Sequence, residues 1–207
     1  MGSEMCIRDR VYASIEASFP NDQVRIGGWT ENEDKAIITA WSDTNPGEMY
    51  YYDRNKGKIA FIAKSRPWID KSEMSPMLPI SFKARDGLTV NGYLTVPKNS
   101  DGKNLPLIIN PHGGPASRDV WGYNPEHQFF ASRGYAVLSM NFRGSTGYGR
   151  SHVKMANGQW GRKMQDDVTD SVNWAVNQGI ADKDNVCIYG ASYGGYAVMA
   201  GITKTPK

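Results

Sequence analysis

A serine lies in a glycine-rich turn that could make it a nucleophile. Residues 190–195 read Gly-Ala-Ser-Tyr-Gly-Gly and so carry a G-x-S-x-G pattern around Ser192. The pattern directly follows an apolar run at 185–189 and directly precedes a run of small residues at 193–201, which predicts a helix. A serine between a buried strand and a helix projects its hydroxyl from a strained turn, the nucleophile elbow. This context predicts acyl-transfer chemistry at Ser192.

The glycines around the serine have a steric reason to be there. Gly190, Gly194 and Gly195 would let the strand and helix backbones approach closely. The helix start would then point its N–H groups and the positive end of its dipole at a developing oxyanion. The alternative is a tight glycine turn that only packs well.

A second motif, His112-Gly-Gly-Pro115, follows the apolar run at 105–110. Such a turn supplies the other N–H of the oxyanion hole in esterases and related hydrolases. We therefore expect the N–H groups of Gly114 and Tyr193 to face one point above Ser192. We expect His112 itself to be a turn histidine that bonds the local backbone.

The base that such a serine needs is missing from this sequence. Its three histidines, His112, His127 and His152, all precede Ser192, and no His, Asp or Glu follows the serine. In this kind of elbow the order is Ser, then Asp or Glu, then His. Serine without a base is a poor nucleophile at neutral pH.

Two further stretches carry polar groups. Residues 141–149 form a glycine-rich loop after an apolar run, but no G-K-[S/T] follows, so a phosphate loop is not indicated. Arg143 in this loop is expected to anchor loops below the site by pairing with a carboxylate. Asp166 and Asp167 could be metal ligands, but adjacent carboxylates at a helix start are more typical of caps.

The elements that must position these residues alternate between strands and helices. The apolar runs predict buried strands and the 3.6-residue periodicities predict helices, which together imply a mostly parallel sheet with helices on both faces. Turn residues 85–87 predict a hairpin. The expected strands are 80–84, 89–96, 105–110, 135–140 and 185–189, and the expected helices are 125–132, 164–178 and 193–201.

The chain before this region has a different pattern. Residues 11–65 predict three or four short antiparallel strands, the size of one β-propeller blade. Residues 66–79 hold three prolines among polar residues and are expected to be a linker. Residues 1–10 match nothing downstream and lack a signal-peptide pattern, so we interpret them as a non-native leader.

Composition excludes several classes of function. The chain has 207 residues, 40% of them hydrophobic, and no apolar run reaches the length of a membrane span. A net charge of +3 without clusters gives no sign of a nucleic-acid partner. Two cysteines are too few for a zinc site or a disulfide framework, and Cys187 is expected to be a small buried side chain. Compartment and oligomeric state are not indicated.

The motifs together resemble those of the prolyl oligopeptidase family of serine peptidases, in its acylaminoacyl-peptidase and dipeptidyl-aminopeptidase-like branch. They occur in the family's order within residues 78–207, and the resemblance rests on the set. The matching pieces are 112–115, 141–149, Trp160-Gly161 with Asp166-Asp167, and 190–195.

This resemblance implies a fold, an activity and a set of roles. Residues 80–207 would be the N-terminal half of an α/β-hydrolase peptidase domain, and residues 11–65 the last blade of a propeller. Ser192 would be the nucleophile, Gly114 and Tyr193 the oxyanion hole, and a peptide the substrate, with neither metal nor organic cofactor. The family's Asp and His lie beyond residue 207, so the chain is expected to be a fragment with little turnover.

Two alternatives remain open. A carboxylesterase uses the same elbow and the same oxyanion hole. A non-catalytic binding or scaffold protein could keep the fold after losing the base.

Overall fold

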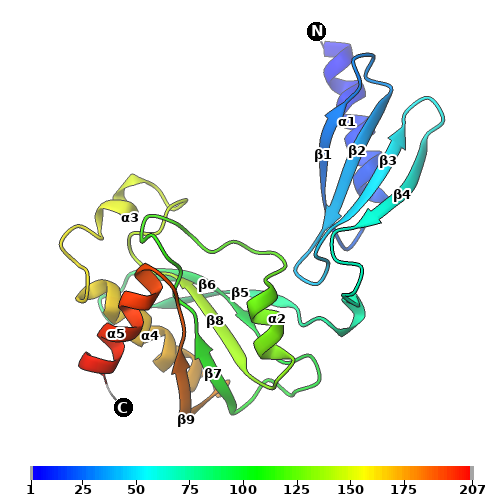
Figure 1. The fold of residues 1–207 in the computed structure, drawn as a ribbon. Helices are drawn as coiled ribbons and strands as arrows, with labels where there is room; N and C mark the ends of the chain where they lie inside the picture. Colours follow the sequence, from blue (N-terminus) through cyan, green and yellow to red (C-terminus); the bar gives the residue numbers. More distant parts are fainter. Residues whose placement is uncertain (1, 206–207) are drawn as a thin grey trace. The chain divides into compact units, whose positions relative to one another are not determined.

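The computed structural model describes residues 2–205, with side chains described from residue 9 onward. The chain divides into two compact units, Met1–Met74 and Ser75–Lys207 (Figure 1). This division falls inside the segment 66–79, which also contains a short 3-10 helix, η1 (Lys71–Glu73), and the start of strand β5 at Met77.

The first unit is built on a four-stranded antiparallel sheet in the order β1-β2-β3-β4. Each strand pairs with the next along the chain, as short loops between strands favour. This meander matches the expected antiparallel segment, and the sheet is open. The strands are β1 (Gln23–Trp29), β2 (Lys35–Trp41), β3 (Glu48–Asp53) and β4 (Lys58–Lys64).

A helix that the sequence pattern did not predict belongs to the same unit. Helix α1 spans Gly2–Ala17, so residues 11–17 are helical and their expected place in a β segment is wrong. Ile15 is fully buried against Ile38 and Tyr52 of the sheet. The helix is held by this packing, because its own sequence has no clear apolar stripe.

The second unit contains a five-stranded sheet in the order β5-β6-β8-β7-β9. The pairs β7–β8 and β7–β9 are parallel, whereas β5–β6 and β6–β8 are antiparallel. The sheet is therefore mixed, and the expectation of a mostly parallel sheet is corrected. The strands are β5 (Met77–Lys83), β6 (Thr89–Thr95), β7 (Leu105–Ile109), β8 (Ala136–Asn141) and β9 (Ala181–Ile188).

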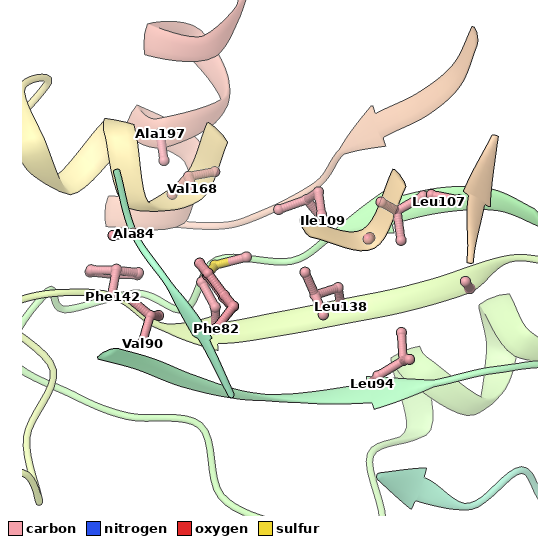
Figure 2. Close-up of a cluster of buried hydrophobic side chains, with 14 of the residues drawn as sticks. Phe82, Ala84, Val90, Leu94, Leu107, Ile109, Leu138, Phe142, Val168 and Ala197 are labelled. Atoms are coloured by element: carbon pink, nitrogen blue, oxygen red, sulfur yellow. The ribbon is translucent and has the colours of Figure 1, made fainter. Parts of the chain in front are cut away.

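Helices cover both faces of this sheet. Side chains that alternate along β7 and β8 point to opposite faces. Leu107 and Leu138 join the core beneath α4 and α5, which Figure 2 shows together with Val168 and Ala197. Helix α2 packs on β6 and β8, and Val137 of β8 is buried outside that core. The helices are α2 (Pro125–Ala131), α3 (Arg150–Lys154), α4 (Lys163–Asn177) and α5 (Tyr193–Lys204).

Strand β9 lies at one edge of the sheet and pairs only with β7. Cys187 on this strand is exposed, so its expected burial is wrong. The apolar composition of 185–189 suggested a strand covered on both faces, but at the edge of the sheet the residues from Lys183 to Cys187 are exposed. Within the described part of the chain, no helix is long and apolar enough to cross a membrane.

Candidate active site

Three loops meet at one edge of the five-stranded sheet. Because β8, β7 and β9 run parallel, their carboxyl ends lie at the same edge. The segment that starts at His112 follows β7, the segment 142–149 follows β8, and Ser192 follows β9. The parallel half of the sheet therefore gathers the sequence motifs, which lie up to 80 residues apart in the chain.

Ser192 has the backbone conformation of a strained turn. Its φ is 57° and its ψ is −121°, and it lies one residue before α5 begins at Tyr193. A side chain in this region of φ and ψ costs energy, of order 1–3 kcal/mol, that the surrounding fold must offset. Ser192 is exposed, and its carbonyl accepts a hydrogen bond from the N–H of Tyr196 at 3.0 Å. The hydroxyl is thus held at the start of a helix and open to solvent.

The glycines of the turn are required by close backbone contacts. A Cβ on Gly190 would lie 2.8 Å from the carbonyl carbon of Gly194. A Cβ on Gly194 would collide with the carbonyl oxygen of Pro111, and one on Gly195 would lie 3.4 Å from the oxygen of Gly190. Only glycine lets the helix start approach both its own strand and the loop after β7 this closely.

The His112-Gly-Gly-Pro115 loop lies directly against the serine. A Cβ on Gly113 would be 3.4 Å from Cβ of Ser192 and 3.9 Å from its Oγ. Gly114 has a φ of 120°, and a side chain there would press on Ala116 and Ser117. Tyr193, as the first helical residue, has an N–H that the helix itself does not use. These contacts bring both expected oxyanion segments to the serine.

His112 forms part of the loop structure, as the sequence led us to expect. Its Nδ1 lies 2.7 Å from the carbonyl oxygen of Gly113, and its Nε2 lies 2.8 Å from Oγ of Ser145. Burial lowers the pKa of His112, so the neutral ring is favoured. Nδ1–H then donates to Gly113, while the Ser145 hydroxyl beside Nε2 also lies 2.7 Å from the carbonyl oxygen of Phe142. Both ring nitrogens are occupied by these two loops.

The other two histidines also bond elsewhere. His127 is buried, and its Nε2 lies 3.2 Å from Oδ1 of Asn110. His152 has its Nε2 3.3 Å from the carbonyl oxygen of Phe142. None of the hydrogen bonds seen among the described residues joins a histidine to Ser192.

Arg143 anchors the loop after β8 through two carboxylates, as expected. Its backbone N–H and Nε donate to Oδ2 of Asp167 at 2.9 and 2.8 Å, and Nη2 donates to Oδ1 at 2.7 Å. Nη1 and Nη2 also donate to Asp86 at 2.8 and 3.0 Å. These bonds hold the pKa of Asp86 well below its usual range. The guanidinium ties together the loop, helix α4 and the hairpin between β5 and β6.

The carboxylates at the start of α4 have separate partners. Asp167 is fully buried and serves Arg143, so a cap on the helix dipole is not its whole role. Asp166 is partly exposed and pairs with Arg85 at 3.2 Å. Over the residues that the structure describes, no group of three or more His, Cys, Asp or Glu side chains is arranged to hold a metal ion.

The sequence did not single out Phe142 as part of this site. Its ring stacks on the ring of His112, with centroids 4.4 Å apart, and packs against Tyr193 at 5.3 Å. A phenylalanine after an apolar strand is indistinguishable from an ordinary core residue in sequence. Its position between the two glycine motifs was the only available signal.

The serine is exposed, lies in a strained turn between a strand and a helix, and contacts a glycine-rich loop at one edge of a sheet with helices on both faces. This arrangement defines the serine hydrolases with an α/β fold. The comparisons identify the family. Residues 121–207 match the family described as "Prolyl oligopeptidase family". The chain belongs to this family of serine peptidases, which the resemblance of its motifs indicated.

Known relatives agree with this assignment. The chain is 43% identical over 182 residues to dipeptidyl aminopeptidase BIII of Pseudoxanthomonas mexicana, covering 84% of this chain and 26% of the relative. A puromycin hydrolase structure matches with a TM-score of 0.71 and 26% identity, over 83% of this chain and 27% of that one. Pyrococcus horikoshii acylaminoacyl peptidase matches with a TM-score of 0.69 and 26% identity, over 87% and 29%.

The chain therefore spans about a quarter of the length of these relatives. Its antiparallel sheet corresponds to their propeller region, and its mixed sheet corresponds to their α/β-hydrolase part.

Proposed function

We propose that Ser192 is the nucleophile of a serine peptidase that cleaves short peptides through an acyl-enzyme. The observation that carries the proposal is the contact between the strained serine and the glycine loop, with Gly113 directly against Ser192. The contact supports the proposal because it brings Ser192, which directly precedes Tyr193, close to the loop that carries Gly114. The names of the relatives, a dipeptidyl aminopeptidase and an acylaminoacyl peptidase, support a peptide substrate.

In this proposal the chain supplies attack and charge stabilisation. Oγ of Ser192 forms a bond to the carbonyl carbon of the peptide, and the carbonyl oxygen takes up negative charge. The N–H groups of Gly114 and Tyr193 donate to that oxygen, and the positive end of α5 favours it further. Collapse of the intermediate breaks the C–N bond as a general base passes the serine proton to the nitrogen, which leaves the acyl group on Ser192 and releases the amine.

The serine proton has no acceptor among the contacts seen here. His112, His127 and His152 all bond other groups. We propose that the base and its orienting carboxylate come from residues other than those of this sequence. The 207-residue chain by itself is then expected to turn over little or no peptide.

The first unit has a role in this proposal as well. Four strands in the order β1-β2-β3-β4 have the form of one propeller blade. We propose that residues 23–64 are such a blade and that 66–79 connects it to the peptidase unit. Selection among peptides then depends on parts of a propeller that these strands do not supply.

The test measures acylation of Ser192 with a supplied base. The folded chain is incubated with p-nitrophenyl acetate and imidazole, and acetyl transfer to each serine is followed by peptide mass spectrometry. Oγ attacks the ester, imidazole takes the proton, and p-nitrophenolate leaves. Because the proposed oxyanion hole would stabilise the charge that develops during attack, Ser192 should be acetylated about 100-fold faster than an ordinary exposed serine.

Ser132 supplies the matched comparison, because it is also exposed and lies away from the elbow. Ser192→Ala should remove the fast acetylation, while Ser132→Ala should leave it in place. Unfolding the chain in urea should abolish the difference between the two serines. Equal acetylation of Ser192 and Ser132 in the folded chain would sink the proposal.

A further inference from the structure

Phe142 touches both segments that carry the expected oxyanion donors. Its side chain is fully buried at the end of β8, within the core shown in Figure 2. The ring of His112 stacks on it nearly parallel, with an interplanar angle of 15° and centroids 4.4 Å apart. The ring of Tyr193 packs on it with an angle of 35° at 5.3 Å. One aromatic ring thus supports His112, two residues before Gly114, and Tyr193, directly after Ser192.

The backbone on both sides of this ring is fixed. Asn141 is fully buried, its Oδ1 accepts from the N–H of Asp119 at 2.7 Å, and its Nδ2 donates to the carbonyl of Asp119 at 3.1 Å. Arg143 is held by Asp167 and Asp86. Phe142 therefore has little freedom to shift, because both of its neighbours are buried and hydrogen-bonded.

Tyr193 is also confined from another direction. The indole of Trp160 meets the Tyr193 ring edge-on, with centroids 4.9 Å apart and an angle of 75°. Tyr193 is buried, whereas Trp160 is half exposed. With Phe142 and Trp160 both against it, the first residue of α5 cannot turn without disturbing two aromatic contacts.

We infer that Phe142 is a positioning residue that sets the separation between the N–H groups of Gly114 and Tyr193. The inference rests on the proposed function, since it assigns these two groups to the oxyanion hole. A donor must lie within hydrogen-bond distance of the oxyanion, and small misplacements at such a site lose much of the rate. The ring works as a rigid spacer because it packs on His112 and on Tyr193 at the same time.

The main experiment compares two phenylalanines of the same core. Phe142→Leu removes the shared ring, and Phe82→Leu is the matched control, since Phe82 is also buried in that core and stacks on Trp174 instead. Amide hydrogen exchange is read at Ser117 and Tyr196, which donate to Pro115 and Ser192. The amide of Ile180, bonded to Ala175, serves as the reference for overall loosening.

We expect Phe142→Leu to speed exchange at Ser117 and Tyr196 about tenfold relative to Ile180. Phe82→Leu should change all three amides by the same factor. If the exchange rates at Ser117 and Tyr196, each relative to that at Ile180, were the same in the two variants, the inference would be overturned, since Phe142 would then be an ordinary core residue. This readout needs no chemistry at Ser192, so it stands or falls separately from the proposed function.

A second pair of variants keeps the inference testable if Phe142→Leu does not fold. His112→Phe keeps a ring against Phe142 but loses the bonds to Gly113 and Ser145, whereas His112→Leu loses the ring as well. We expect slow exchange at Ser117 in the first variant and fast exchange in the second. Fast exchange in both would show that hydrogen bonds, not ring packing, hold the loop, and would refute the spacer role.

The imidazole-dependent acetylation completes the test. Phe142→Leu should slow it about tenfold at Ser192, while Phe82→Leu leaves it near the rate of the unaltered chain. If the unaltered chain shows no fast acetylation, the proposed function fails and the exchange data alone decide the coupling. If acetylation is fast and unaffected by Phe142→Leu, the inference fails and the proposed function survives.

Discussion

The free energy of unfolding should fall as pH rises and the buried carboxyl group of Asp119 ionises. Asp119 lies in the loop after β7, where its backbone N–H and carbonyl both bond the Asn141 side chain. Its Oδ2 is buried and has no hydrogen-bond partner among the described residues. Burial raises the pKa of Asp119 from 3.8 to about 7. A carboxyl group in this position is more stable protonated than ionised.

The size of the effect follows from this shift in pKa. Each pKa unit is worth about 1.4 kcal/mol, so the shift from 3.8 to about 7 gives an upper limit of about 4 kcal/mol. Water still reaches part of the residue, and we expect about 2 kcal/mol instead. Between pH 3.8 and about 7 the folded chain binds more protons at this site than the unfolded chain. The stabilisation is therefore complete below pH 3.8, falls through this window and is absent above it.

The perturbation is Asp119→Asn, which cannot ionise. The free energy of unfolding is measured in urea at several values of pH, with hydrogen exchange followed in residues 75–205, so that the unit carrying Asp119 is read by itself. At pH 4 the variant should be no more stable than the original chain, because its amide is also left without a partner. At pH 8 it should be more stable by about 2 kcal/mol.

The exposed Asp101 supplies a control for losing one carboxylate. Asp101→Asn should change the free energy by less than about 0.5 kcal/mol at either pH. A difference between Asp119→Asn and the original chain that stays constant from pH 4 to pH 8 would refute the reasoning, since Asp119 would then be ionised throughout.

Three other outcomes are expected. Arg143→Lys should lower the free energy of unfolding of the second unit by about 3–5 kcal/mol in urea, because the fully buried Asp167 loses its paired guanidinium. Ser192→Gly should raise that free energy by about 1 kcal/mol in the same assay, because glycine adopts a φ of 57° without strain, while acetylation at position 192 disappears. Burial lowers the pKa of His127 from 6.5 to about 4, so only the unfolded chain takes up the proton between these two values. The free energy of unfolding should therefore fall by about 3 kcal/mol as pH falls through this range. In an acid titration, the free energy of unfolding of His127→Gln should fall less steeply with pH, and the same dependence in both chains would contradict this.

The strands and helices of the second unit were predictable because burial leaves a strong signal. Strands β7 and β8 are covered on both faces and therefore read as continuous apolar runs. Helix α4 buries Met164, Val168 and Ala175 at helical spacing, as expected. What a single strand cannot reveal is where the hairpin β5–β6 docks. It pairs antiparallel with β8, which makes the sheet mixed.

Two wrong predictions, the burial of Cys187 and the β structure of residues 11–17, have the same physical origin. Cys187 lies in an apolar run but on an edge strand, and the edge is decided by strand order rather than by local sequence. Ile15 belongs to a helix whose sequence shows no apolar stripe, and its burial comes from the sheet beneath it. In both cases the tertiary neighbour overrides the local pattern.

The glycines of the site were predictable for the opposite reason. Gly190 and Gly194 are needed by the local turn, where any Cβ would strike backbone, so their spacing appears in the sequence. Phe142 and Asp86 act over long separations in sequence, the first by ring packing and the second by pairing with Arg143. A single sequence gives no sign of such partners.

In the proposed site, the serine and its oxyanion donors are held by contacts that do not depend on the base. The strain at Ser192 and the crowding at Gly194 arise from the turn between β9 and α5, and the loop after β7 is held by Ser145 and Asn141. None of these contacts involves a general base. Donors fixed before the base is present cost no reorganisation when charge develops, which is the condition for electrostatic stabilisation. A chain of this kind should therefore bind and stabilise an oxyanion at Ser192 while leaving the proton transfer to a group supplied from elsewhere, and imidazole is the simplest such group.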